Sequence, residues 1–111
     1  MQYPEFMKRF PALDIPFPAD VVKTHAIRSD AGLVVFFDFL QDVTLPAHSH
    51  LAQWGTFLCS QIEMVIGGIT KTVKPGDKWD IPAHVEHNVR IKAGSKASDD
   101  FEAPDRYSLV T

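Results

Sequence analysis

Residues 62–92, IEMVIGGITKTVKPGDKWDIPAHVEHNVRIK, contain the clearest indication of how this chain folds. Short runs of β-branched and other apolar residues alternate here with turn residues, and these runs are Ile62–Ile66, Ile69–Val73, Lys78–Ile81 and His87–Lys92. Between the first two runs, Gly67 and Gly68 both accept a positive φ without steric cost, which is typical of a tight hairpin. Regular short strands with frequent turns predict a β-sandwich or a β-barrel.

The same pattern continues outward over most of the chain. Further runs of this kind are Lys23–Arg28, Leu33–Leu40, Val43–His50, Trp54–Cys59 and Tyr107–Val110. The 8 prolines and 6 glycines are spread along the sequence, so few windows have room for several uninterrupted helical turns. We therefore predict one all-β barrel domain over residues 23–111, with little or no helix.

The first 22 residues differ from the rest because they combine apolar side chains with prolines. Phe6, Phe10, Leu13, Ile15 and Phe17 are interleaved with four prolines, and such a segment cannot pair in a central strand. We predict a proline-rich arm over residues 1–22. Two interpretations stay open, because the arm either wraps the barrel and closes one of its ends or packs on a partner subunit.

Composition excludes several classes of function. A chain of 111 residues has room for one domain with one core. The net charge of -3, without any run of lysine or arginine, predicts no nucleic-acid partner. The longest apolar run, residues 32–37, is followed by Asp38, so we expect no membrane span. The N-terminus lacks the apolar core of a signal peptide and Cys59 has no second cysteine to pair with, which favours a cytoplasmic location.

Four of the five histidines fall into two groups, His48-Ser49-His50 and His84-Val85-Glu86-His87. Residues two apart on a strand point to the same face, with Cβ atoms roughly 6.5 Å apart. Two imidazoles placed in this way reach one ion at metal–nitrogen distances of about 2.0–2.1 Å. A His-x-His pair alone also fits two polar residues that face solvent, but the apolar residues on both sides of this pair favour an interior site.

These residues resemble the two sequence motifs of the cupin superfamily. The first cupin motif runs from a glycine through His-x-His and a glutamate to a second glycine. Here His48 and His50 match the histidine pair, and Gln53 stands in place of the glutamate. Asp42 and Ser60 replace the two glycines, which affects only the geometry of the turns.

The second cupin motif matches more completely. It consists of a glycine, Pro-x-Gly, a histidine and an asparagine, and Gly76, Pro82 and His87 occupy the matching positions. His84 replaces the second glycine, and an isoleucine replaces the asparagine. The resemblance covers residues 33–107 and implies the double-stranded β-helix, or jelly-roll barrel, of cupins.

The resemblance also implies one divalent transition metal, held by His48, His50, Gln53 and His87. Gln53 offers its carbonyl oxygen as a ligand, and the alternative is an orienting hydrogen bond just outside the metal's ligands. An amide in place of a carboxylate leaves the ion its full positive charge. This favours Zn²⁺, Ni²⁺, Cu²⁺ or Co²⁺, which suit imidazole, over Mn²⁺, and iron stays open as well.

Other polar residues have weaker claims to the site. His84 lies in the turn before the strand of His87, and we expect it at the mouth of the site rather than on the metal. Glu86 should point away from the metal, because it alternates with His87 on that strand. Asp38 and Glu63 are expected to face water for the same reason.

The remaining candidates are single residues. We expect His25 on the surface, whereas Cys59 shares the strand parity of Gln53 and is expected inside as a small apolar residue. Arg90 and Arg106 are equally consistent with an anionic ligand and with surface salt bridges. Most large aromatic side chains are expected in the core, with some around the metal: Trp54, Trp79, Phe36, Phe37, Phe39 and Phe57.

The sequence leaves two classes of function open. The first is a metalloenzyme, and because no acid is evident in the pocket, the favoured reaction is dioxygenase-like and acts on a small chelating organic substrate. The second is a non-catalytic module that binds or senses a small molecule or the metal itself. We also expect a homodimer, since small barrels have edge strands that need cover and the arm offers apolar surface.

Overall fold

The computed structural model of the protein describes residues 1–110. Within this range, one short 3₁₀ helix precedes eleven strands. Their bounds are η1 Glu5–Arg9, β1 Leu13–Asp14, β2 Val22–Ser29, β3 Gly32–Phe39, β4 Val43–His48, β5 Gln53–Cys59, β6 Ile62–Ile66, β7 Ile69–Val73, β8 Lys78–Ile81, β9 His87–Ile91, β10 Lys96–Phe101 and β11 Ser108–Leu109. No helix among the described residues has the length and apolar character to cross a bilayer.

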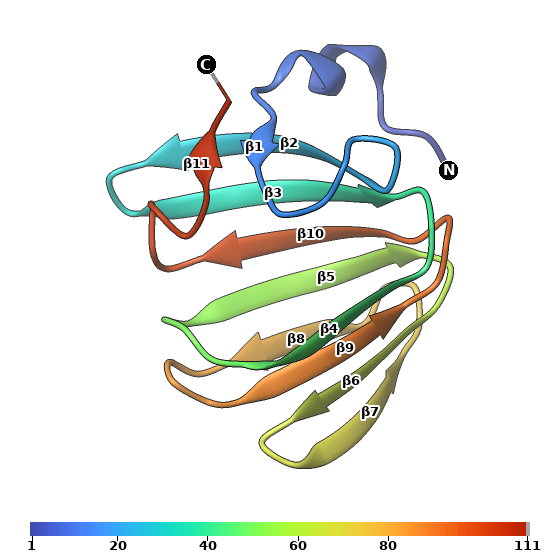
Figure 1. Ribbon diagram of the computed structural model, residues 1–111, viewed down its shortest axis with the longest axis vertical. Helices are drawn as coiled ribbons and strands as arrows, with labels where there is room; N and C mark the ends of the chain where they lie inside the picture. The colour runs from blue at the N-terminus through green and yellow to red at the C-terminus, as the bar shows by residue number, and fades with distance from the viewer. Residues whose placement is uncertain (111) are drawn as a thin grey trace.

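Two antiparallel sheets form the body of the molecule (Figure 1). The five-stranded sheet has the order β2-β3-β10-β5-β8, and the four-stranded sheet has the order β4-β9-β6-β7. From β3 to β10 the chain passes to the other sheet at every connection except the β6–β7 hairpin, which is the winding of a jelly roll. The predicted all-β fold with little helix is therefore confirmed.

The core lies between the inner faces of the two sheets. In β3 the burial alternates residue by residue, and Leu33, Val35, Phe37 and Phe39 point inward. Each such side chain contributes about 1.5–3 kcal/mol when it leaves water. The opposite sheet supplies Met64, Val89 and other aliphatic residues, so two amphipathic sheets cover one another.

The β6–β7 hairpin has the turn that its sequence predicts. Gly67 and Gly68 connect Ile66 to its cross-strand partner Ile69, and their φ angles are 56° and 81°. Positive φ at both central residues gives a twist that matches the flanking strands. The predicted hairpin is confirmed.

Strand β10 is absent from the strands that the sequence predicts, although it lies in the middle of the five-stranded sheet between β3 and β5. Its sequence, KASDDF, lacks the β-branched residues that favour a strand. Two neighbouring strands supply hydrogen bonds on both of its sides, and this tertiary context overrides the weak local preference. The omission matters because β10 contributes to the candidate site.

The arm packs on the barrel of its own chain (Figure 1). The buried Tyr3 donates a hydrogen bond of 2.8 Å from its hydroxyl to the backbone oxygen of Phe37. Strand β1 pairs with β11, so the two terminal segments form a ribbon of their own. A contact between the arm and a partner subunit, and the division of the chain at residue 22, stay predictions.

Candidate metal centre and its cavity

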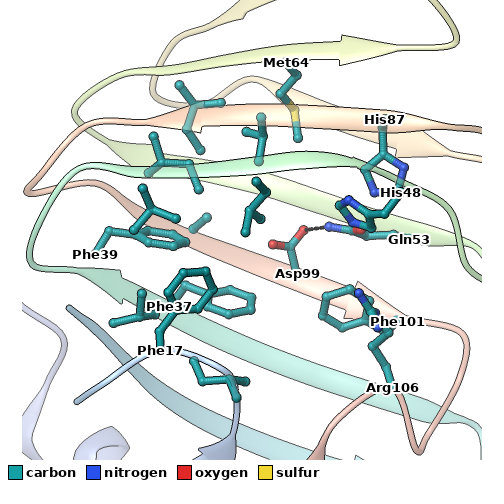
Figure 2. Close-up of a pocket in the computed structure, with 18 of the residues that line it drawn as sticks. Phe17, Phe37, Phe39, His48, Gln53, Met64, His87, Asp99, Phe101 and Arg106 are labelled. Carbon is teal, nitrogen blue, oxygen red and sulfur yellow. Dashed lines mark hydrogen bonds between the residues drawn. The ribbon is translucent and has the colours of Figure 1, made fainter. Parts of the chain in front are cut away.

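A cavity of about 510 Å³ lies between the two sheets, and the candidate metal centre is at one end of it (Figure 2). Side chains from both sheets line it, as do residues 15–17 of the arm and residues 106–107 before β11. A volume of this size is typical of sites for small molecules.

Three histidines meet at this end of the cavity. His48 ends β4 and is the cross-strand partner of His87, the first residue of β9, and their ring centroids are 4.2 Å apart. The ring of His50 lies 5.3 Å from that of His48 and 4.9 Å from that of His87. His50 itself follows the end of β4, so the expectation that both residues of the pair lie on one strand is wrong. A hydrogen bond of 2.7 Å from the backbone N–H of His84 to the carbonyl of His50 holds this loop instead.

Backbone carbonyls determine which nitrogen of each ring is protonated. The Nδ1 atoms of His48, His50 and His87 lie 2.9, 2.6 and 3.0 Å from the carbonyl oxygens of Pro46, Leu51 and Val85. Since a carbonyl only accepts hydrogen bonds, each Nδ1 carries the proton and each Nε2 presents a lone pair. The Nε2 atoms of His50 and His87 are buried and have no hydrogen-bond partner.

The electrostatics favour the neutral form of two of these imidazoles. Burial lowers the pKa of His50 and of His87 below the usual value of 6.5, and the charge of Arg106 lowers both further. One nitrogen from each of the three rings lies within 4.8 Å of the others. Converging neutral imidazole nitrogens with free lone pairs fit a divalent transition metal such as zinc.

Gln53 lines the same cavity from the first position of β5, and its side chain is buried. Its amide Nε2 donates a hydrogen bond of 2.8 Å to Oδ1 of Asp99. Figure 2 shows the Gln53 side chain between Asp99 and His48. Because the nitrogen is engaged by Asp99, the carbonyl oxygen is the atom that remains to face an ion. Its role as the fourth ligand stays a prediction.

Asp99 is the site residue that sequence reasoning missed. It lies on β10, its side chain lines the cavity, and its Oδ1 also accepts a hydrogen bond of 2.8 Å from Nε1 of Trp79. Burial raises the pKa of Asp99 to about 6. The expectation that the pocket holds no acid is therefore wrong. In a strand, adjacent side chains point to opposite faces, so one of Asp99 and Asp100 must point inward. This inference requires knowing that β10 is a strand, and the sequence does not indicate it.

The absence of a side chain at Gly55 makes room for this arrangement. A Cβ atom built at Gly55 would overlap both the indole ring of Trp79 and Oδ1 of Asp99. The glycine therefore allows the carboxyl and the indole N–H to approach each other against the β5 backbone. Strand β5 contributes to the site through a residue with no functional group as well as through Gln53.

Arg106 brings a positive charge to the cavity. Its guanidinium carbon lies 4.6 Å from the ring centroid of Tyr107, and its Nε is buried without a hydrogen-bond partner. Among residues 1–110, no carboxylate forms a salt bridge with it. Arg90, by contrast, is exposed on β9 and does not line the cavity. Of the two arginines considered from the sequence, the structure brings only Arg106 to the site.

His84 is exposed in its turn with a φ of 66°, in the left-handed region that favours glycine. It is not among the converging histidines, and its place at the mouth of the site stays a prediction. Its side chain does not line the cavity. Glu86 and Glu63 are exposed, as the alternation of their strands predicts.

Three expectations about single residues are wrong. Cys59 does not line the cavity, because a β-bulge next to Lys96 reverses the alternation at the end of β5. Asp38 is half-buried and pairs with Lys96 at 3.2 Å instead of facing water. His25 is half-buried under the arm, with its ring 5.9 Å from that of Tyr3.

The large aromatic residues mostly follow the expectation. Phe37, Phe39, Phe57 and Trp79 are buried in the core. Trp54 is 44% exposed, since it alternates to the outer face of β5.

Comparison with known proteins supports the architecture. No protein-family model matches the sequence. No curated protein matches it either. Among solved structures, an RmlC-like cupin from Shewanella frigidimarina has a TM-score of 0.75 and 20% identity, covering 96% of this chain and 94% of that one.

Two further structures extend this likeness. KdgF from Halomonas sp. has a TM-score of 0.69 and 18% identity, covering 85% of this chain and 86% of that one. A variant of oxalate decarboxylase from Bacillus subtilis has a TM-score of 0.70 and 14% identity; the match covers 89% of this chain but only 29% of the enzyme. Since all three identities are low, the likeness concerns the fold. The chain therefore has the cupin fold, with a three-histidine cluster that is suited to a metal ion at one end of its cavity.

Proposed function

We propose that the protein is a metal-dependent enzyme that moves a proton on a small organic acid. The observation that carries this proposal is the convergence of three imidazole Nε2 lone pairs at the end of a cavity that also holds Asp99 and Arg106. His48, His50, Gln53 and His87 are the proposed ligands. A divalent ion bound there would hold substrate oxygen atoms and polarise a carbonyl group.

Arg106 is the proposed anchor for the acid group of the substrate. Its half-buried guanidinium has no carboxylate partner within residues 1–110, and its charge lowers the pKa values of His50 and His87. A guanidinium binds a carboxylate through two parallel hydrogen bonds, and this geometry fixes the orientation of a small ligand.

Asp99 is the proposed proton carrier. Gln53 and Trp79 both donate to Oδ1, so this oxygen is held in place while Oδ2 remains for a substrate. Burial raises the pKa of this carboxyl to about 6, close to the pH at which an acid–base catalyst works best. A carboxyl positioned in this way accepts a proton from a carbon atom next to a carbonyl group and returns it.

This acid is the reason to prefer proton transfer over the two alternatives. The dioxygenase-like reaction predicted from the sequence requires no acid in the pocket, and neither does a module that only binds or senses. One further structure of oxalate decarboxylase is described as containing Mn(II) centres, which supports a metal and a small carboxylate ligand in this fold. Which metal this chain binds stays open among zinc, nickel, iron, cobalt, copper and manganese.

The proposal is tested by isotope exchange, which requires no knowledge of the natural product. Zn²⁺-loaded protein is incubated with pyruvate in D₂O, and proton NMR follows the loss of the methyl signal. We expect faster exchange with the wild-type protein than with buffer and Zn²⁺ alone. Asp99→Asn preserves an oxygen that accepts hydrogen bonds but cannot carry a proton, so its exchange should be about 100-fold slower or more.

The matched control is Asp100→Asn, since the neighbouring residue on β10 does not line this cavity. This control should exchange at the wild-type rate. Equal rates for Asp99→Asn and the wild type would contradict the proposed role of Asp99. Oxygen consumption without exchange would instead support the dioxygenase-like reaction, and binding of pyruvate without either would support the binding module.

A further inference from the structure

The cavity has two chemically different ends. Its polar end holds the histidines, Gln53, Asp99 and Arg106. Trp79 uses its indole N–H on Asp99, the ring of Tyr107 lies against Arg106, and the other lining residues are apolar. Figure 2 shows Asp99 between these two regions, with His48 and His87 on one side and Phe17, Phe37 and Phe39 on the other. The apolar end is formed by Phe17, Phe37, Phe39, Val43, Ile62 and Ile91.

No polar side chain belongs to this apolar end. Phe37, Phe39 and Val43 are each less than 10% exposed, so these side chains themselves have little contact with water. A hydroxyl group placed there loses hydrogen bonds to water and finds no partner on the protein to replace them, which weakens binding. Alkyl or aryl groups incur no such cost and gain contact with the phenylalanine rings.

The arm helps to form this end of the cavity. Phe17 follows β1, which is fixed by its pairing with β11 and by a hydrogen bond of 2.8 Å from the backbone N–H of Leu13 to Oγ1 of Thr24. Phe17 is only partly buried, and it packs against the core from a loop. It is therefore placed to contact a ligand while contributing less than a core residue to the folding of the barrel.

We infer that the substrate is an organic acid with an apolar tail, and this inference rests on the function proposed above. The acid group lies at Arg106 and the histidines, and an alkyl or aryl tail extends past Asp99 towards Phe17, Phe37 and Phe39. The volume of about 510 Å³ exceeds what a two- or three-carbon acid fills. Acids that carry hydroxyl groups along their chain bind this apolar wall more weakly than acids of the same length with an alkyl chain.

The experiment measures the dissociation constants of a homologous series by calorimetry with Zn²⁺-loaded protein. The probes are pyruvate, 2-oxobutanoate, 2-oxopentanoate and 2-oxohexanoate. If the tail enters the apolar end, each added methylene tightens binding about fourfold. The polar comparison is 2-oxogluconate, which has as many carbons as 2-oxohexanoate but carries hydroxyl groups, and it should bind about tenfold more weakly or worse.

The variant Phe17→Ala tests whether the side chain of Phe17 contacts the tail of the ligand. The ratio of the affinities for 2-oxohexanoate and pyruvate should fall about fivefold in this variant, because the tail loses contact area while the acid end is unchanged. Phe6→Ala is the matched control, since Phe6 lies in η1 of the same arm, is exposed and does not line the cavity. Its ratio should equal that of the wild type.

Two outcomes overturn the inference, and they are distinguishable. If pyruvate binds but affinity does not increase along the series, or 2-oxogluconate binds as tightly as 2-oxohexanoate, the apolar tail is wrong and the proposed function remains. If none of the acids binds to the metal-loaded protein, the proposed function is wrong and the inference falls with it. The wild-type series gives this answer even where Phe17→Ala does not fold.

Discussion

At the scale of single residues, the site depends on which atom each side chain leaves free. His48, His50 and His87 each use Nδ1 on a backbone carbonyl, and Gln53 uses its nitrogen on Asp99. The atoms that remain are three imidazole lone pairs and one amide oxygen. Backbone carbonyls and a buried carboxyl thus orient the proposed ligands before any ion binds, as is typical of metal sites.

The histidine pair gives the most direct prediction. Protein purified without a histidine tag should contain close to one metal ion per chain by elemental analysis. His48→Ala combined with His50→Ala should reduce this content to near zero, because a single imidazole and an amide do not hold a dication. His84→Ala should leave the content unchanged, since that side chain lies outside the cavity. Metal retained in the double variant would place the site elsewhere.

Asp99 predicts a dependence of stability on pH. Its pKa is about 6 in the folded protein, whereas an unfolded aspartate titrates near 3.9. As the pH rises from about 4 to 6, the unfolded chain releases this proton and the folded chain retains it, so the free energy of unfolding falls. Above pH 6 the loss is complete and amounts to about 3 kcal/mol.

Asp99→Asn removes this titration but preserves an oxygen that accepts from Gln53 and Trp79. Urea denaturation of chelator-treated protein should therefore show the variant to be more stable than the wild type at pH 7.5. The difference should shrink towards zero below about pH 4, where Asp99 of the wild type becomes protonated in the unfolded chain as well as in the folded one. A variant that is less stable than the wild type at neutral pH would contradict the expectation that the buried, ionised Asp99 lowers the free energy of unfolding.

At the scale of elements, the strands differ in how clearly the sequence marks them. The predicted bounds of β6, β7 and β8 agree with the structure residue for residue, because β-branched runs end there at glycine or proline turns. Strand β10 lacks this signal. It forms because β3 and β5 pair with it on both sides. The same contrast holds for the site residues: the histidines were predicted from the sequence, whereas Asp99, on β10, was not.

The end of β5 shows the same limit. Counting by twos from Gln53 places Cys59 inside, but the bulge opposite Lys96 adds a residue and reverses the faces. A bulge depends on how two strands are aligned, and neither sequence alone specifies it. The alternation of inward and outward side chains can therefore be counted only over the part of a strand that pairs regularly.

At the scale of the whole molecule, the open question is assembly. We predict a homodimer, because the barrel has edge strands and large apolar side chains remain exposed, among them Ile69 and Phe6 at 73% and 65%. Light scattering at micromolar concentration should give twice the chain mass. If the arm forms the contact, Phe6→Glu should shift the protein towards monomer, whereas a monomeric wild type would reject the prediction.

The class of fold follows from local properties of the chain, its hairpin glycines, proline turns and short β-branched runs. The grouping of His48 and His50 with His87 follows from the resemblance to the cupin motifs. That Asp99 and Arg106 join these histidines is visible only in the folded protein. Both residues come from the C-terminal part of the chain, and strand pairing and the packing of the two sheets bring them to His48 and His50, which are more than 45 residues away in sequence. The chemistry of the cavity depends on contacts between distant segments, and such contacts leave no periodic pattern in any one of them.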